Sequence, residues 1–246
     1  MTTKIAPITV LVLGASGATG RLLVQQLLDR GLSVRAVVRN RSSLPPALAD
    51  AEGLTIHEAS VLDLETADLV NLVKGCAAVA SCLGHNLTFK GVFGSPRRLV
   101  TDAARRICNA VQETAPDEPV RFVLMNTTGN RNRGLDERIS FAQKCVIGLL
   151  RVGVPPHADN EDAAEFLRSE IGSGHPHLQW CAVRPDGLTD EEAVTDYELH
   201  PSPTRSAIFD AGKTSRINVA DFMARLAEGG ELWEQWQGQM PVIYNK

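Results

Sequence analysis

Three features that would assign this 246-residue sequence to a common class are missing from it. No block of basic residues occurs and the formal net charge is -4, so nucleic-acid binding is not expected to be the main function. No apolar run approaches the ~20 residues that a membrane-spanning helix needs, so no membrane partner is expected. Internal repeats and low-complexity tracts are also absent, and the 43% hydrophobic content instead predicts a sizeable folded core.

Cysteine usage excludes a disulfide scaffold. The five cysteines are an odd number and contain no C-x-x-C pair, so neither a disulfide framework nor a metal site is expected. The first residues run directly into an apolar segment, leaving no room for the charged and apolar regions of a secretion signal. We therefore expect a cytoplasmic protein with reduced thiols.

Strand-like and helix-like segments alternate along most of the chain. Short apolar runs typical of buried strands cover 8–13, 33–38, 54–58, 76–84, 120–125, 178–184 and 241–244. Helical spacing is found at 21–30, 64–73, 96–114, 135–151, 159–169 and 218–228. The alternation implies right-handed crossovers and an α/β fold, a doubly wound parallel sheet covered by helices on both faces.

A glycine-rich turn joins the first strand to the first helix. Gly14, Gly17 and Gly20 stand where the chain must bend sharply, let backbone N–H groups approach a pyrophosphate, and pack a helix closely on the sheet. The start of the helix adds an anion site. The turn predicts a dinucleotide phosphate cradle, with packing alone as the alternative. Its members are Gly14, Ser16, Gly17, Ala18, Thr19 and Gly20.

The residue that closes the second strand predicts which nicotinamide cofactor binds. An NAD-selective site places Asp or Glu there for the ribose 2′-hydroxyl, whereas an arginine can pair with a 2′-phosphate. Arg39 occupies this position and Arg41 follows it. Bidentate guanidinium–phosphate geometry favours NADP(H), and an ordinary basic loop is the alternative.

Further site candidates follow the carboxyl ends of the expected strands, where doubly wound sheets bind their ligands. They are Leu83, Gly84, Asn126, Thr127, Thr128 and Pro185. Threonines can equally close a strand and cap a turn, so both roles stay open for Thr127 and Thr128. Asp63 follows the third strand and is predicted to be the N-cap of the helix 64–73.

From Asp186 the pattern becomes polar and loop-like. We predict that residues 1–185 form an NAD(P)-binding core and that 186–246 form a small C-terminal lobe, which faces the substrate and completes the same domain. Within this lobe, Asn218 and Asp221 resemble an N-cap and its partner three residues later.

The whole chain resembles the atypical short-chain dehydrogenase/reductases, most of all the NmrA-like and NAD(P)H:flavin or biliverdin reductase-like members. The resemblance rests on Gly14-Ala-Ser-Gly-Ala-Thr-Gly20, Val38-Arg39, Asp63, Arg184-Pro-Asp-Gly-Leu188 and Ser215-Arg-Ile-Asn-Val-Ala-Asp-Phe222. It implies a Rossmann fold and NAD(P) binding. It also implies that Asp63 contacts adenine and that Thr127 and Thr128 line the nicotinamide pocket.

One departure from this family affects the chemistry. Members with dehydrogenase activity place Tyr and Lys four residues apart ahead of an Ala-Glu pair, which matches Ala164-Glu165 here. Counting back places Glu161 where Lys would be and His157 where Tyr would be. Carbonyl reduction therefore lacks its usual proton donor, although His157 could serve as a weak acid near neutral pH. A surface loop histidine is the alternative.

Two functions remain open from the sequence. The first is an NADPH-dependent reductase that transfers hydride to a planar small-molecule acceptor such as a flavin or quinone, whose ring delocalises the incoming charge. His157, Thr127 and Thr128 are then the catalytic candidates. The second is a non-catalytic regulator or scaffold of the NmrA-like type that senses NADP(H), which the missing Tyr and Lys favour.

Overall fold

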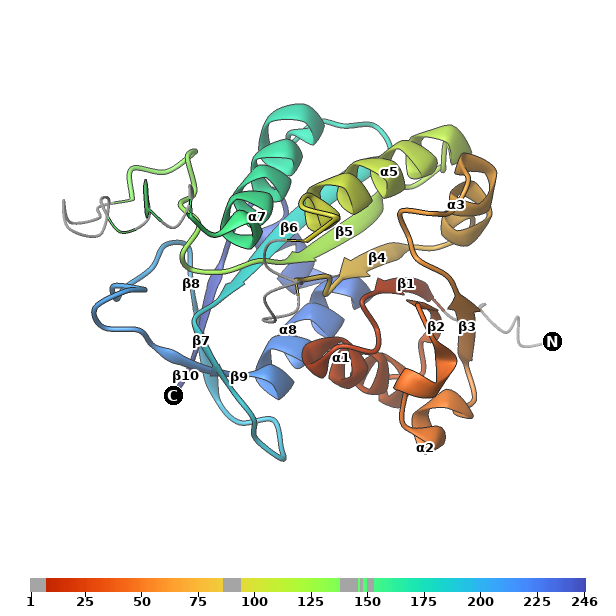
Figure 1. The fold of residues 1–246 in the computed structure, drawn as a ribbon, viewed down its shortest axis with the longest axis horizontal. Helices are drawn as coiled ribbons and strands as arrows, with labels where there is room; N and C mark the ends of the chain where they lie inside the picture. The colour runs from red at the N-terminus through yellow and green to blue at the C-terminus, as the bar shows by residue number, and fades with distance from the viewer. Residues whose placement is uncertain (1–7, 86–93, 138–145, 147, 150–152) are drawn as a thin grey trace.

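The computed structural model describes residues 8–85, 94–137, 146, 148–149 and 153–246 (Figure 1). Its centre is an eight-stranded sheet in the order β3-β2-β1-β4-β5-β6-β10-β8. The strands are β1 (Thr9–Leu13), β2 (Ser33–Val38), β3 (Leu54–Glu58), β4 (Ala78–Ser81), β5 (Val120–Met125), β6 (Leu178–Pro185), β8 (Tyr197–His200) and β10 (Val242–Asn245). The order 3-2-1-4-5-6 is that of a doubly wound fold, and only β8 runs antiparallel to its neighbour in this sheet. The predicted fold class is thus confirmed.

Helices cover both faces of the sheet (Figure 1). On one face lie α3 (Thr66–Val73), α5 (Leu99–Thr114) and α7 (Pro155–Phe166), and on the other α1 (Ala18–Asp29), α8 (Arg216–Glu228) and α9 (Glu231–Trp236). Two short turns, η1 (Arg41–Ser43) and α2 (Pro46–Ala49), follow β2, and η2 (Leu167–Ile171) extends α7.

The central strands β1 and β4 are mostly apolar because both of their faces are buried, whereas the edge strands β3 and β8 contain polar and partly exposed residues. In β1, Val10 and Val12 pack toward the α1 and α8 face, whereas Leu11 and Leu13 pack toward the α3 and α5 face. All four side chains are fully or almost fully buried. Alternate side chains of β1 thus enter two different cores, which explains why the strand is a continuous apolar run and could be predicted from the sequence.

The C-terminal segment is more regular than the sequence predicted. Where polar loop was expected, β7 (Gly187–Thr189) and β9 (Lys213–Ser215) form a small parallel sheet, and β8 joins the main sheet through β10. The predicted cap of α8 is wrong: Ser215 is the N-cap and its hydroxyl accepts the Asn218 N–H. Asn218 is instead buried in the first turn, where its amide bonds the side chains of Thr195 and Asn245.

Two other helix starts differ from prediction. Helix α3 begins at Thr66 after Glu65, so Asp63 is not its N-cap but lies in the preceding turn. Helix α7 begins at Pro155 rather than near Asp159, because the two prolines occupy its first positions, where the missing N–H groups need no partner. The predicted helix at 135–151 falls mostly outside the described residues.

Candidate functional site

The turn between β1 and α1 is tightly packed around the Gly14 backbone. Gly14 has a φ of +71°, and a Cβ there would lie 2.8 Å from the carbonyl carbon of Cys82. A Cβ at Gly20 would lie 2.1 Å from the Gly14 oxygen, which already accepts the Gly17 N–H at 3.0 Å. Only glycine fits at 14 and 20, since either side chain would meet backbone rather than a movable neighbour.

The start of α1 is open to an anion. Gly17 is the N-cap, and no side chain among the described residues accepts a hydrogen bond there. The first turn carries no acidic residue. The N–H groups of Ala18, Thr19 and Gly20 precede the intrahelical bonds, so they can bind a phosphate oxygen at the positive end of the helix dipole. These features fit the pyrophosphate of a dinucleotide.

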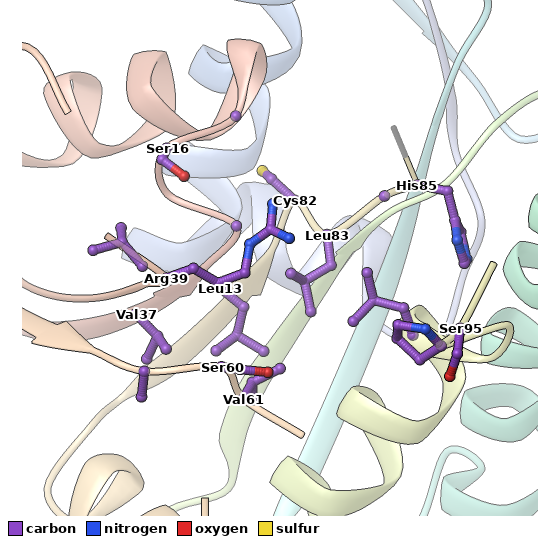
Figure 2. Close-up of a pocket in the computed structure, with 17 residues that line it drawn as sticks. Leu13, Ser16, Val37, Arg39, Ser60, Val61, Cys82, Leu83, His85 and Ser95 are labelled. Atoms are coloured by element: carbon purple, nitrogen blue, oxygen red, sulfur yellow. The ribbon is translucent and has the colours of Figure 1, made fainter. Parts of the chain in front are cut away.

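A cavity of about 340 Å³ opens beside this turn, large enough for a small-molecule ligand (Figure 2). Figure 2 shows Ser16 and Arg39 toward one end, His85 and Ser95 toward the other, and Leu83 between them. The remaining lining residues are Leu13, Gly14, Gly17, Val37, Val38, Ala59, Ser60, Val61, Cys82, Gly84, Pro96 and Leu99. The carboxyl ends of β1, β2, β3 and β4 therefore converge on one space.

The two arginines after β2 behave differently. Arg39 lines the cavity, and no ion pair formed among the described residues involves it. The Arg41 guanidinium instead donates to the Ala49 carbonyl at 2.9 Å and to Asp50 at 3.1 Å. Arg41 does not line the cavity, so the structure brings only one of the two predicted arginines to it.

At the end of β3 the cavity is bounded by Ser60 and Val61 rather than by Asp63. Asp63 is exposed, and its N–H donates to the Ser60 carbonyl at 2.9 Å. Sequence spacing alone did not reveal that Asp63 lies outside the cavity lining, because the chain forms a turn at residues 60–63 before α3 begins. Ala18, Thr19 and Gly20 lie outside the lining as well, although they form the first turn of the helix beside it.

The residues that follow β5 form a separate hydrogen-bonded turn. The Asn126 side chain donates to the Asn160 carbonyl at 3.0 Å and accepts from the Thr127 N–H at 2.8 Å. The Thr128 N–H donates to the Pro185 carbonyl at 3.0 Å, and Thr128 is buried. None of these four candidates (Asn126, Thr127, Thr128, Pro185) is part of the cavity lining formed by the described residues.

His157 is not a loop residue. It lies in the first turn of α7, largely buried, with Nε2 3.8 Å from the Glu161 carboxylate one turn later. A Cβ added to Gly129 would lie 3.4 Å from its ring, so His157 packs beside the turn after β5. It is not part of the cavity lining, and neither of the two tyrosines, Tyr197 and Tyr244, is either.

The sequence analysis missed a buried pair at the far end of the cavity. Nε2 of His85 lies 2.8 Å from Oδ2 of Asp159, and the two side chains are 3% and 0% exposed. Asp159 also accepts the backbone N–H groups of Val100 and Thr101 at 2.8 and 2.9 Å, so α7 supplies the cap for the start of α5. Local patterns could not reveal a contact between residues 74 positions apart.

Behind the turn after β5, one fully buried arginine joins three segments. Arg184 of β6 binds the Glu137 carboxylate at 2.8 Å and donates to the carbonyls of Asn130, Pro201 and Met240. A charged residue inside an otherwise apolar strand was a usable signal, because a buried guanidinium requires a partner. The pair fixes the loop that follows β5 against the C-terminal segment.

The cysteine on the cavity wall is not a reactive thiolate. Burial raises the pKa of the Cys82 thiol to about 12, so this group stays protonated at neutral pH. The thiols of Cys76, Cys108 and Cys181 are buried and free as well.

Among the helices of the described part of the chain, none is long and apolar enough to cross a membrane.

These features place the protein in a known class. Residues 14–229 match the NAD(P)H-binding domain family, and the chain belongs to that family. Its glycine turn, open helix start and cavity at the strand ends are the elements that such a domain uses to hold a dinucleotide. The resemblance seen in the sequence is thereby confirmed at the level of family and fold.

Individual proteins that resemble the chain share only a modest fraction of its sequence. The chloroplastic protein TIC 62 of Pisum sativum is 27% identical over 241 residues, covering 91% of this chain and 41% of that protein. The chain spans less than half the length of the curated relatives it matches. A Veillonella parvula short-chain dehydrogenase/reductase solved with NADP shares the fold, with a TM-score of 0.68, 19% identity, and 97% and 94% of the two chains covered. An anaerobillin reductase from Escherichia coli O157:H7 also shares the fold, with a TM-score of 0.67 and 18% identity. The match covers 96% of this chain and 97% of that chain.

Proposed function

We propose that the protein is an NADPH-dependent reductase that transfers hydride to a planar small-molecule acceptor such as a flavin or quinone. The observation that carries the proposal is the single cavity that joins the glycine turn, Arg39 and the end of β4. A cofactor held by the turn and by Arg39 would extend along this wall toward His85. A reductase needs its dinucleotide held at the carboxyl ends of the strands, and the acceptor would bind beside the nicotinamide end of this cofactor.

The preference for NADPH rests on Arg39. Its side chain lines the cavity at the end of β2, where a guanidinium can pair with a 2′-phosphate and where NAD(H) would need a carboxylate partner. Arg41 contributes less in this proposal, because its guanidinium is engaged with Asp50. The cofactor would therefore be selected mainly by one charge-assisted contact.

A planar acceptor is proposed because the usual carbonyl-reducing pair is missing. His157 and Glu161 stand where Tyr and Lys would be, and the two tyrosines of the chain lie elsewhere. An acceptor ring that spreads the incoming charge lowers the demand on the protein for a strong acid. An anaerobillin reductase among the structures with this fold is consistent with such an acceptor.

Steady-state NADPH consumption tests this proposal. FMN, riboflavin, menadione and a panel of simple ketones are compared as acceptors, alongside calorimetric titration with NADPH and NADH. We expect turnover with flavins or quinones, poor turnover with ketones, and tighter binding of NADPH than of NADH. Tighter binding of NADH would contradict the cofactor assignment, and turnover restricted to ketones would contradict the acceptor class.

The alternative function is a regulator that senses NADP(H) without turnover, of the NmrA-like type. Its supporting observation is the same replacement of Tyr and Lys by His157 and Glu161. Tight NADPH binding with no consumption above background for any acceptor would favour it. A protein partner that binds only with NADPH or only with NADP⁺ present would support it directly.

We also propose that the protein works in the cytoplasm or another reducing compartment. The four free cysteines of the described chain, Cys76, Cys82, Cys108 and Cys181, suit such a compartment. Fractionation of cells that express the native protein tests this, and recovery from an oxidising compartment would contradict it.

A further inference from the structure

The His85–Asp159 pair occupies the end of the cavity opposite Arg39 (Figure 2). His85 comes directly after Gly84 and lines the cavity, although its side chain is only 3% exposed. Asp159 lies behind it on α7. The imidazole is therefore held at the boundary between the ligand space and the protein interior.

The hydrogen bonds of Asp159 fix the state of the imidazole. Asp159 accepts two backbone N–H groups, from Val100 and Thr101, in addition to its contact with Nε2 of His85. Since this carboxyl group is the acceptor in both backbone bonds, we take it as the acceptor in the contact with His85 as well, with Nε2 as the donor. The contact with Asp159 leaves Nδ1 as the second ring nitrogen, the one available to a ligand in the cavity.

We propose that His85 is the proton donor of the reduction and that Asp159 is its positioning residue, an inference that rests on the proposed reductase function. Bound NADPH would supply the hydride and become NADP⁺, and the acceptor atom that gains negative charge would take the proton from Nδ1 of His85. The N–H bond of Nδ1 breaks as the new O–H or N–H bond forms. Solvent returns one proton to His85 before the next cycle, so one NADPH and one proton are consumed for each acceptor reduced.

His85 is better placed for this role than His157. His85 lines the cavity, whereas His157 packs beside Gly129 in the turn after β5 and is absent from the lining. Both histidines have a carboxylate neighbour, but the His85 contact is 2.8 Å and that of His157 to Glu161 is 3.8 Å. The short contact with Asp159 orients the His85 ring, and orientation sets the efficiency of proton transfer.

Other charged groups around the pair are more exposed. At the start of α5, Arg98 lies 3.7 Å from Asp102 and 3.6 Å from Asp162 of α7, and all three side chains are about half exposed. Solvent screens the influence of these groups, so Asp159 is the main charge against the imidazole among the residues that the structure describes.

The first experiment compares two kinds of acceptor in the His85→Gln variant. Menadione needs a proton when its oxygen becomes anionic, whereas N-methylacridinium takes a hydride and becomes neutral without one. We expect His85→Gln to lose about 10²-fold or more in kcat with menadione and less than about threefold with N-methylacridinium, after subtraction of the uncatalysed rate. NADPH affinity should stay within about threefold. His175→Gln, a histidine outside the cavity, serves as the matched control and should leave both rates unchanged.

The outcomes separate this inference from the proposed function. If the wild-type protein does not oxidise NADPH with any of the acceptors tested, the reductase function itself is overturned. Wild-type turnover that survives His85→Gln with menadione overturns only the role of His85. Equal losses with both acceptors mean that the pair is structural, which also overturns the inference.

Two further measurements test the pair as a unit. The wild-type rate with menadione should depend on pH, and the His85→Gln profile should be flat over the same range. In His85→Ala, added imidazole should restore menadione turnover without changing the N-methylacridinium rate. Asp159→Asn should weaken the pH dependence, and circular dichroism checks that α5 keeps its cap. A wild-type profile retained in Asp159→Asn, or no rescue by imidazole, would contradict the assignment.

Discussion

The glycine turn and the buried polar contacts elsewhere in the molecule are built in opposite ways. The turn is made of backbone, and its hydrogen bonds are local, from the Gly17 N–H to the Gly14 carbonyl and from the Arg21 N–H to the Gly17 carbonyl, although Gly14 also packs against the backbone of Cys82. The polar contacts join side chains from distant segments, as in His85 with Asp159 and Arg184 with Glu137. A phosphate cradle can thus be encoded locally, whereas the groups that hold the rest of the site together depend on the completed fold.

The largest loss of stability is expected from Arg184→Met. The change removes a guanidinium that is fully buried and leaves the Glu137 carboxylate unpaired in the interior. Loss of one partner of a buried ion pair costs about 3–5 kcal/mol of the free energy of unfolding. Urea denaturation measures it.

Two variants sharpen that result. The double variant Arg184→Met with Glu137→Met should recover much of the loss, because no charge is then stranded. Arg205→Met removes the exposed pair with Asp210 and should have a much smaller effect. If Arg205→Met destabilised the protein as much as Arg184→Met, burial would not be what makes the long-range contacts important.

Within the local turn, Gly20→Ala should cost about 1–3 kcal/mol, since its Cβ would lie 2.1 Å from the Gly14 oxygen and the turn must shift. The same shift should weaken NADPH binding, because the N–H groups at the start of α1 move. Gly174→Ala is the control, as a Cβ there meets nothing within 4 Å. Denaturation and NADPH titration of both variants measure the effects. Unchanged NADPH affinity in a destabilised Gly20→Ala variant would show that the turn does not bind the cofactor.

Arg39→Asp should affect binding rather than stability. Loss of a charge-assisted contact with the 2′-phosphate corresponds to about 1.5–3 kcal/mol, or roughly ten- to hundredfold in NADPH affinity. NADH affinity should rise or stay the same. Arg41→Gln should change NADPH affinity less, because Arg41 binds Asp50. Calorimetric titration compares the two, and a larger effect at Arg41 would overturn the assignment.

The smallest effect is a pH dependence that involves Tyr197. Burial, together with the neighbouring Asp221, raises the pKa of Tyr197 from 10 to about 12. Because the folded state holds the proton more tightly than the unfolded state, this contribution is complete below pH 10 and is lost as the pH rises toward 12. Tyr197→Phe should flatten the decline of stability over this range, measured by urea denaturation, and an unchanged decline would show that the phenol is not responsible.

The sequence predicted the parts of the fold that are set by local patterns. The strands from β1 to β6 and the helix α1 follow from apolar runs and helical spacing, and the glycine turn follows from residues that are adjacent in the chain. The short strands β7, β8 and β9 were missed because only pairing with distant segments defines them. The cap of α8 was assigned to Asn218 instead of Ser215, since either residue type can cap a helix.

The same distinction between local patterns and distant packing holds for the residues of the candidate site. Gly14, Ser16, Gly17, Arg39, Leu83 and Gly84 were predicted from local patterns and do line the cavity. His85 and Ser60 line it too but gave no local signal, and the contact of His85 with Asp159 depends on how α7 packs against α5. A single sequence does not contain that packing in any local window.

The position of β10 delays completion of the sheet during synthesis. This strand pairs with β6 on one side and with β8 on the other, so β8 is joined to the described sheet only through residues that are made much later. Until β10 is made, Tyr197–His200 has no strand partner in the described sheet, although β1 to β6 can already pair. Amide hydrogen exchange during refolding should therefore protect β8 no earlier than β10, because β8 pairs with no other strand of the described sheet.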